Sequence, residues 1–507
     1  MSGRERGLVT LGEVARATGG TLTGDENVEV ADVTHDSRQA RAGTLFVAIQ
    51  GESVDGHAFL KQVAEQAAAG VISERERPAS FDGAWIMVAD ARKALAQAAG
   101  VVHGHPSREL NLVGITGTNG KTTTTYLVAA IAEAAGEPVA LTGTVEYRVA
   151  DERKKADRTT PEASDMQRLL RRAVEAGCRT AVMECSSHAI DLHRCDGLDL
   201  SVAVWTNLTR DHLDYHKTMQ AYFEVKRRLF DGSLGRRPRA AVINTDDARG
   251  SELARELAAT GQRVLRYALN READVTASEV EHTLEGMRFR LRTPVGERAL
   301  TSPLVGRPHI YNIMAATGTG LELGYELDVI ARAVESCSGA PGRFERVPHA
   351  GDFAVVVDYA HTDDALVNVL RTARDVTRGR IITVFGCGGD RDRSKRAPMG
   401  EAAASLSDVV ILTSDNPRTE DPERILADVE EGMRVAGKPY QKIADRRSAI
   451  HLAIAEARRG DVVLIAGKGH EDYQIIGREV FHFDDKEVAR EALEGKKRRN
   501  KLTGWTG

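Results

Sequence analysis

The sequence predicts an α/β protein of three domains in which strands alternate with helices. Its 507 residues exceed what one hydrophobic core usually organises. Apolar strands alternate with helical segments from Asn111 to about Gly339, which is typical of βαβ units and a mostly parallel sheet. A second series of this kind runs from Phe353 to Ala466. The residues before Asn111 differ, because short β-like runs mix there with Ala-rich helical stretches.

Turn-forming residues mark the boundaries between these blocks. Pro106 and Ser107 close the first block, and Ala340-Pro341-Gly342-Arg343 opens the third. We therefore predict a small α/β N-terminal domain at residues 1–108, a central domain with a mostly parallel sheet at 109–340, and a C-terminal Rossmann-like domain at 341–507.

Shorter sequence patterns predict individual helices and strands within each domain. Thr44–Ile49 is a strand-like run in the first domain. Met287–Arg292 alternates with period two before a Pro-Val-Gly turn, which indicates an antiparallel edge hairpin with one solvated face. Asp421-Pro422-Glu423 has the residues that begin a helix. The other predicted strands are Asn111–Thr116, Thr180–Met183, Ser201–Thr206 and Ala240–Asn244, then Phe353–Val357, Ile381–Phe385, Val409–Thr413 and Val462–Ala466.

Composition excludes several classes of protein. The hydrophobic fraction is 42% and the charged fraction 28%, as in a globular chain. No run approaches the roughly 18 apolar residues of a membrane helix, and no secretory signal is visible. The net charge of −5 argues against binding nucleic acid through bulk charge. The five cysteines contain no CxxC pair and predict free thiols in a reducing cytoplasm.

The strongest motif is a glycine-rich loop between a predicted strand and a predicted helix. It reads Gly114-Ile115-Thr116-Gly117-Thr118-Asn119-Gly120-Lys121-Thr122-Thr123 and departs from G-x-x-x-x-G-K-[ST] at Ile115. Such loops wrap phosphate with backbone N–H groups, while Lys121 reaches the β/γ-phosphates and Thr122 ligates Mg²⁺. The pattern favours a nucleotide-binding loop over an ordinary strand–helix turn, so the central domain is predicted to contain a P-loop.

Polar clusters follow two further strands of the central domain. Glu184 ends the strand Thr180–Met183, where a carboxylate beside a phosphate loop suits Mg²⁺. Taken alone, a strand-end Glu is more often a salt-bridge partner. The segment Asn207–His216 is dense in potential ligands, although a single His is usually structural. Together the two clusters predict a metal and phosphate site.

These motifs, taken in order, resemble the ATP-dependent Mur ligases, and among them the members that add diaminopimelate. The matching segments are TGTNGKTT, MECSSHAIDLHR, NLTRDHLDYH, DYAHT, FGCGGDRDRSKRAPMG, SDNPRTEDP and GKGHEDYQ, from about Asp36 to Gln474. The resemblance implies an N-terminal domain for the uridine nucleotide, a central ATPase and a C-terminal domain for the incoming amino acid.

The resemblance also implies a reaction. Meso-2,6-diaminopimelate would be joined to UDP-N-acetylmuramoyl-L-Ala-D-Glu through an acyl phosphate formed with ATP, in peptidoglycan precursor synthesis and hence cell-wall biogenesis, cell shape and cell division. The expected cofactors are ATP and Mg²⁺, and the expected partners are these substrates, with no nucleic acid and no membrane span. We expect a cytoplasmic monomer. Because a carboxylate must approach a polyanion, fixed positive charge is required first.

Several residues acquire implied roles in catalysis and ATP binding. Lys121, Glu184, His212 and Lys226 are the implied catalytic residues, and Thr122, Glu184, His212 and Lys226 the implied metal ligands. Lys226 would be carbamylated by CO₂, a reaction that requires a neutral amine. Without the resemblance, Lys226 would be interpreted as a solvated lysine on a helix. The implied ATP-binding residues are Gly117, Thr118, Asn119, Gly120, Lys121, Thr122, Thr123, Asn312, Arg343, Asp358 and His361.

The incoming amino acid is expected at the end of the strand Val409–Thr413. Diaminopimelate has a second amino-acid head, and Arg418 offers a planar fork for its carboxylate. Relatives that use lysine lack this arginine. Alternatively, Arg418 pairs with Glu420 or Asp421. The implied diaminopimelate-binding residues are Arg391, Asp415, Asn416, Pro417, Arg418, Gly467 and Glu471.

The sequence is less specific about the residues that would contact the UDP-linked substrate. The implied contacts are Ser37, Glu52, Ser53, Val54, Thr159, Thr160, Ser186, Leu192 and Arg194. Leu192 stands where relatives often carry Gln, Arg158 where Asn is frequent, and Asp363 where Pro is common. These departures concern the uridine and peptide contacts and leave the ATP and diaminopimelate motifs intact.

Two other functions remain open at this level. The first is another amide ligase on the same scaffold, either a lysine-adding Mur ligase or an enzyme like folylpolyglutamate synthetase. The second is a nucleotide-switched scaffold without enzymatic activity, which would bind ATP, form no product and tolerate Lys226→Ala.

Overall fold

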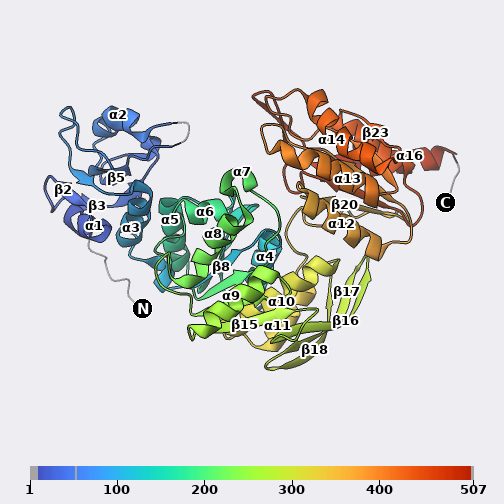
Figure 1. Cartoon of the computed structure of the whole chain (residues 1–507), viewed down its shortest axis with the longest axis horizontal. Coiled ribbons are helices and arrows are strands. Elements are labelled where there is room, and N and C mark those ends of the chain that lie inside the picture. The colour runs from blue at the N-terminus through green and yellow to red at the C-terminus, as the bar shows by residue number, and fades with distance from the viewer. Residues whose placement is uncertain (1–8, 52–53, 504–507) are drawn as a thin grey trace.

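The computed structural model describes residues 9–51 and 54–503. The chain forms three lobes in sequence order, each with its own β-sheet (Figure 1). The predicted α/β class with three domains and mostly parallel sheets is confirmed. In the described ranges, no helix is long and apolar enough to cross a membrane.

The N-terminal lobe contains a five-stranded sheet in the order β2-β7-β6-β5-β4. The predicted run at residues 44–49 is β5, which is buried along its whole length. The elements of this lobe are β1 (Val9–Thr10), α1 (Leu11–Thr18), β2 (Thr21–Thr23), β3 (Glu29–Val30), β4 (Asp32–Thr34), β5 (Thr44–Val47), α2 (Leu60–Glu65), β6 (Gly70–Ser73), β7 (Trp85–Met87) and α3 (Ala91–Val102), with 3-10 helices at Ser37–Gln39 and Gly56–Phe59.

The segment that follows α3 is packed against the rest of the protein. Pro106–Arg108 forms a 3-10 helix in which Pro106 and Ser107 are buried. Arg168 of the central lobe forms an ion pair of 3.1 Å with Asp32, and Arg171 donates to the carbonyl of His103 at 2.9 Å. These contacts attach the N-terminal lobe to one helix of the central lobe, α5.

The central lobe contains an eleven-stranded sheet in the order β11-β10-β9-β12-β8-β13-β14-β15-β16-β17-β18. Its strands are β8 (Asn111–Thr116), β9 (Val139–Thr142), β10 (Glu146–Val149), β11 (Glu152–Lys155), β12 (Thr180–Glu184), β13 (Val202–Trp205), β14 (Ala240–Asn244), β15 (Arg263–Ala268), β16 (Val275–Thr283), β17 (Gly286–Thr293) and β18 (Gly296–Ser302). The run from β9 to β16 is parallel, whereas the hairpins at both ends are antiparallel.

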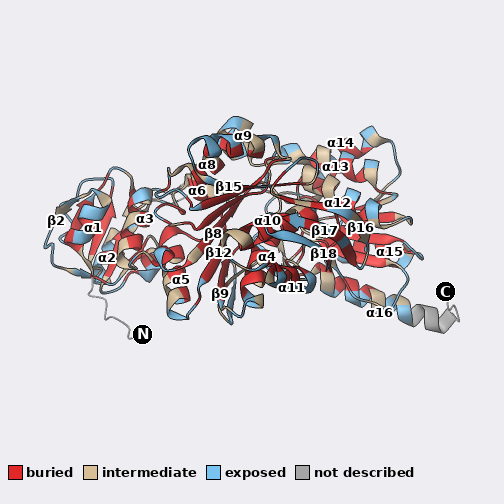
Figure 2. Cartoon of the chain, turned by 90° about the horizontal axis from the view of Figure 1, so that it is seen from below, coloured by how far each residue is buried: buried red, intermediate tan, exposed pale blue. Residues whose placement is uncertain are grey.

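Helices cover both faces of this sheet, so that its middle strands are buried (Figure 2). One face packs against α4 (Lys121–Ala134), α10 (Arg307–Glu322) and α11 (Leu327–Ser336). The other packs against α5 (Ala163–Glu175), α6 (Ser187–Asp191), α8 (Met219–Asp231) and α9 (Ala248–Ala259), while α7 (Leu213–His216) lies near the sheet edge. The predicted period-two segment is β17, in which buried and exposed residues alternate.

The C-terminal lobe contains a six-stranded sheet in the order β19-β20-β24-β21-β22-β23. Asp421 caps α14 and Pro422 is its first residue, as the sequence predicts. The elements are β19 (Glu345–Arg346), β20 (Ala354–Asp358), α12 (Asp363–Val376), β21 (Ile381–Phe385), α13 (Arg396–Leu406), β22 (Val409–Leu412), α14 (Pro422–Ala436), β23 (Gln441–Lys442), α15 (Arg446–Glu456), β24 (Val462–Ala466), β25 (Tyr473–Ile476), β26 (Glu479–His482) and α16 (Asp485–Thr503), with a 3-10 helix at Arg393–Lys395.

A buried ion pair fastens α16 to the C-terminal sheet. The side chains of Arg446 and Asp485 are both 0% exposed and lie 2.6 Å apart. Arg446 also donates to the carbonyl of Ala466, the last residue of β24, at 3.0 Å. Removing one member of such a pair leaves an uncompensated buried charge, which is strongly destabilising.

We predict that Arg446→Ala lowers the free energy of unfolding of the C-terminal lobe by about 3–5 kcal/mol. The neighbouring Arg447 pairs with Glu491 at the surface and is the matched control, because Arg447→Ala should cost about 1 kcal/mol or less. Urea unfolding followed by far-UV circular dichroism measures both effects. Equal losses for the two variants would contradict the prediction.

Candidate active site

The glycine-rich loop lies between the carboxyl end of β8 and the first turn of α4. Gly117 and Gly120 have φ angles of +144° and +87°, which favour glycine. A Cβ on Gly117 would lie 1.8 Å from the hydroxyl of Thr206, and one on Gly120 would lie 2.5 Å from the side-chain oxygen of Asn312. Both glycines are therefore required. The helix begins at Lys121, directly after Gly120, which ends the loop.

The end of β13 holds this loop in place. The backbone N–H of Asn119 donates to the side chain of Asn207 at 3.0 Å. The hydroxyl of Thr206 donates to the carbonyl of Asn119 at 2.6 Å. The loop conformation is thus fixed before any phosphate binds.

Two lysines converge on one carbonyl oxygen of the loop. Lys121 Nζ donates to the carbonyl of Gly117 at 3.0 Å, and Lys226 Nζ donates to the same oxygen at 2.9 Å. Lys226 is 1% exposed. Burial, and then the charge of Lys121, lower the pKa of Lys226 well below its ordinary value. Burial also lowers the pKa of Lys121, whereas the nearby carboxylate of Glu184 opposes this shift.

Glu184 is fully buried at the carboxyl end of β12, beside the loop. Its carboxylate accepts a hydrogen bond from the hydroxyl of Thr122 at 3.0 Å, and from the backbone N–H and hydroxyl of Thr144 at 2.8 and 3.1 Å. The predicted neighbours Glu184 and Thr122 are therefore in direct contact. None of these donors belongs to a lysine or an arginine, so they do not support the alternative interpretation of Glu184 as a salt-bridge partner.

His212 belongs to an aromatic cluster above the lysines. Its ring centroid lies 4.9 Å from that of His188 and 6.1 Å from that of Tyr222. Burial lowers the pKa of His212 to about 4, so the imidazole is neutral at pH 7 and can be a ligand. Asp211 acts electrostatically on Lys121, Lys226 and His212, and it was not among the sequence candidates.

The donor set suits a hard cation that is bound mainly through phosphate. Within the described residues, no three His, Cys, Asp or Glu side chains are arranged to hold a metal ion by themselves. Mg²⁺ commonly uses one or two protein oxygens together with substrate phosphates, and the adjoining oxygens of Thr122 and Glu184 fit that mode.

Two cavities lie in this region, and the first of them is lined by residues of the loop. One of about 600 Å³ is lined by Asn119, Gly120, Thr123, Asn312, Arg343 and Asp358, all expected on the ATP side. His361 instead lines the other cavity, of about 490 Å³, together with residues expected to bind the amino acid. Nδ1 of His361 lies 2.9 Å from the carbonyl oxygen of Tyr359. The other ring nitrogen, Nε2, takes no part in that contact.

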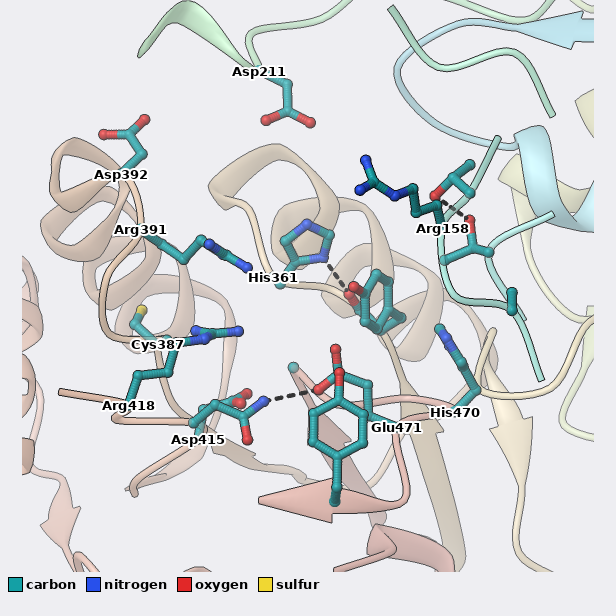
Figure 3. Close-up of a pocket in the computed structure, with 18 of the residues that line it drawn as sticks. Arg158, Asp211, His361, Cys387, Arg391, Asp392, Asp415, Arg418, His470 and Glu471 are labelled. Carbon is teal, nitrogen blue, oxygen red and sulfur yellow. Dashed lines mark hydrogen bonds between the residues drawn. The ribbon is translucent and has the colours of Figure 1, made fainter. Parts of the chain in front are cut away.

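The second cavity lies where the carboxyl ends of the central and C-terminal sheets face each other. Figure 3 shows Arg391 and Arg418 pointing into it from one side, opposite Glu471 and His470. Of the residues expected to bind diaminopimelate, Arg391, Asp415, Asn416, Arg418, Gly467 and Glu471 line the cavity, whereas Pro417 does not.

The environment of Arg418 excludes the alternative of a local salt bridge. Its guanidinium donates to the carbonyl of Gly389 at 2.8 Å. Glu420 is occupied by Arg396 and Arg393, and the bonds from Arg396 lower the pKa of Glu420 to about 2. Asp421 caps α14. Arg418 therefore keeps guanidinium nitrogens available to the cavity.

The central and C-terminal lobes are in contact beside both cavities. Asp364, at the start of α12, accepts hydrogen bonds from Asn119 at 2.8 Å and from Thr209 at 2.9 Å. Asp363, which stands where relatives often have Pro, forms an ion pair of 2.8 Å with Arg210. On another side, Lys155 of β11 contacts Asp472. Asp364 and Lys155 were missed because their partners are distant in the sequence.

The residues expected to bind the UDP-linked substrate are divided between two regions. Thr159 lines the 490 Å³ cavity, and Thr160 contacts Ser186 at 3.4 Å and Arg194 at 3.3 Å. Leu192 follows α6. Ser37 and the exposed Val54 lie in the N-terminal lobe, outside the two cavities. Glu52 and Ser53 lie outside the described residues.

Comparison with known proteins places the chain in a family. Residues 29–103 match a model described as "Mur ligase family, catalytic domain", residues 115–320 the "Mur ligase middle domain", and residues 342–469 the "Mur ligase, glutamate ligase domain". The chain therefore belongs to the Mur ligase family. It is an ATP-dependent ligase that forms an amide bond.

Its relatives include enzymes named UDP-N-acetylmuramoyl-L-alanyl-D-glutamate–2,6-diaminopimelate ligase. That of Bacillus velezensis is 46% identical and the alignment covers 92% of this chain and 94% of the relative. That of Solibacter usitatus is 47% identical, with coverage of 92% and 94%. A solved structure with the same name is 33% identical, with a TM-score of 0.70 and coverage of 97% and 99%.

A more distant structure supports the fold alone. The MurF ligase from Thermotoga maritima in complex with ADP is 18% identical, with a TM-score of 0.65, and the superposition covers 93% of this chain and 99% of that one.

We predict that Gly117→Ala weakens nucleotide binding at least about 100-fold, because the Thr206 hydroxyl would force the loop to move by an ångström or more. Gly136→Ala is the control, since Gly136 also has a positive φ but a Cβ there meets nothing within 4 Å. That variant should lose about 1 kcal/mol of stability and keep its affinity. Titration with a fluorescent ATP analogue separates them, and equal affinities would contradict the prediction.

Proposed function

We propose that this ligase adds meso-2,6-diaminopimelate to the D-glutamyl carboxylate of UDP-N-acetylmuramoyl-L-Ala-D-Glu, a step in peptidoglycan precursor synthesis. The observation that carries the proposal is the position of Arg418 in a cavity that also contains Asp415 and Glu471. A guanidinium on one side and carboxylates on the other complement an amino-acid head, which carries both charges. The names of the 46–47% identical relatives support the same substrates.

The proposed division of labour follows the three lobes. Residues 1–108 would bind the uridine end, residues 109–340 would bind ATP, and residues 341–507 would bind the incoming amino acid. Ser37, Glu52, Ser53 and Val54 would then contact the uridine nucleotide, whereas Thr159, Thr160, Ser186, Leu192 and Arg194 would contact the muramoyl peptide. The contact between Thr160 and Ser186 beside Glu184 supports a peptide end close to the phosphates.

ATP would occupy the 600 Å³ cavity with its phosphates on the loop. Asn312, Arg343 and Asp358 line that cavity, and Gly117–Thr123 supplies backbone N–H groups and the Lys121 ammonium. The γ-phosphoryl group passes to the substrate carboxylate, which replaces a very poor leaving group by phosphate. Positioning and preorganised charge are the main contributions of a protein to this transfer.

Thr122, Glu184, His212 and a carbamylated Lys226 would hold Mg²⁺. When bound, the cation would supply charge neutralisation to the phosphate oxygens. The low pKa of buried Lys226 supports carbamylation, because only a neutral amine reacts with CO₂. The carbamate would place an anion beside Lys121 and provide oxygen ligands.

The amine then attacks the acyl phosphate across the 490 Å³ cavity, and phosphate leaves as the amide forms. Arg391, Asp415, Asn416, Arg418, Gly467 and Glu471 hold the amino acid on the C-terminal side of this cavity, with Pro417 shaping the loop. His361 would contact the reacting groups here as well as the ATP side. The contacts of Asp363 and Asp364 with the central lobe would keep the two lobes together around the intermediate.

The remaining alternatives differ in their substrates or products. A lysine-adding ligase has no need of Arg418, and a folylpolyglutamate synthetase would use a folate acceptor. A non-enzymatic scaffold would form no ADP. We also propose a cytoplasmic location, because the substrates are ATP and a nucleotide-linked precursor and all five cysteines are unpaired. The expectation of a monomer stays a prediction.

We predict that the wild-type protein, given ATP, UDP-N-acetylmuramoyl-L-Ala-D-Glu and diaminopimelate, yields ADP and a product with the mass of the amide. Arg418→Met should lower the preference for diaminopimelate over lysine by about two to four powers of ten, since charged hydrogen bonds to the distal carboxylate are lost. Arg424→Met, on the exposed face of α14, is the control. Mass spectrometry and ADP release measure both; turnover with lysine and none with diaminopimelate would refute the assignment.

A further inference from the structure

Lys468 is a fully buried cation directly behind the proposed amino-acid site. Its side chain is 0% exposed, and it does not line the cavity. Nζ donates to the side-chain oxygen of Asn416 at 3.1 Å and to the carbonyl of Tyr473 at 2.6 Å. No role assigned above uses this charge.

The same ammonium group lies close to two of the carboxylates that line the cavity, those of Asp415 and Glu471. Nζ is 3.6 Å from Asp415 Oδ1 and 3.8 Å from Glu471 Oε2. Asn416 joins the two sides, because its amide nitrogen donates to Glu471 at 2.9 Å while its oxygen accepts from Lys468. Lys468 therefore connects the polar side chains of Asp415, Asn416 and Glu471.

Two neighbouring buried carboxylates are unfavourable without such a cation. Burial, and then the charge of Asp415, raise the pKa of Glu471, whereas Lys468 opposes this shift. Removing the Lys468 ammonium would leave these two carboxylates without the cation that offsets their repulsion. An incoming ammonium has three N–H donors and needs acceptors only. With Lys468 in place, the carboxylate oxygens of Asp415 and Glu471 lie within 4 Å of a buried ammonium group.

We propose that Lys468 is a positioning residue that makes this wall specific for the distal ammonium group of the incoming amino acid. The inference rests on the proposed function. It assigns recognition of the distal end of the amino acid to two residues. Arg418 selects the distal carboxylate, whereas Lys468 orders Asp415, Asn416 and Glu471 to select the distal ammonium. Gly467 contributes by its lack of a side chain, since a Cβ there would lie 2.6 Å from Asp415 Oδ2.

A purely structural role for Lys468 makes a different prediction. Its bond to the Tyr473 carbonyl also fastens β25, whose Ile475 accepts a backbone hydrogen bond from Arg418. If that support were the whole role, substitution would impair every amino acid to the same extent. If Lys468 orders the ammonium site, only substrates with a distal ammonium lose their advantage.

The test compares three amino acids that differ only at the distal end: diaminopimelate with both charges, lysine with the ammonium alone, and 2-aminopimelate with the carboxylate alone. The full-length variants are Lys468→Met and Lys468→Gln; the latter retains hydrogen-bond donors for Asn416 and Tyr473. Lys486→Met is the matched control, because Lys486 pairs with Glu345 away from the cavity.

We expect wild-type kcat/KM to be at least tenfold higher for diaminopimelate than for 2-aminopimelate. Both Lys468 variants should reduce that ratio at least tenfold, mainly through KM, while Lys486→Met leaves it unchanged. An unchanged or increased ratio in either folded variant overturns the inference, and so does a wild-type enzyme that uses the two substrates equally. If the wild type uses lysine alone, the proposed function itself fails, which is a separate outcome.

Discussion

The constraint on which this structure depends is the meeting of two lysine side chains at one backbone carbonyl. Lys121 and Lys226 both donate to the oxygen of Gly117, and Lys226 has almost no contact with solvent. Two ammonium charges at this spacing and burial repel each other and lack hydration, so one of them is readily lost. Conversion of the neutral Lys226 amine to a carbamate would remove the repulsion and give Lys121 an anionic neighbour. The glycines, the clamp from β13 and the carboxylate of Glu184 all serve to hold this arrangement.

The second organising feature is that two parallel sheets direct their carboxyl ends at one cavity. Ligands of open α/β sheets bind at those ends. Here the central lobe provides Thr144 and His212 to the cavity, while the C-terminal lobe provides Arg391, Arg418 and Glu471. If the acyl phosphate and the amine are held by different lobes, as proposed, the contacts of Asp364 and Lys155 between the lobes are as relevant to the reaction as the charged groups of the cavity.

Local patterns predicted much of this, whereas relations between distant residues did not. The strands at 111–116, 240–244, 381–385 and 462–466 occur as expected, because apolar β-branched runs bounded by turns specify buried strands. The loop at Gly117–Lys121 is a contiguous motif. In contrast, nothing local shows that Asp364 reaches Asn119, that His361 faces the amino-acid cavity, or that Lys468 is buried behind Glu471.

The central claim is that Lys226 exists as a carbamate in the active enzyme. Carbon-13 NMR of protein exchanged with ¹³C-labelled bicarbonate tests it most directly, with Lys226→Met as the reference. The account predicts one carbamate resonance that is present in the wild type and absent from the variant. A wild-type preparation that turns over substrate in the presence of labelled bicarbonate yet gives no such resonance would contradict it.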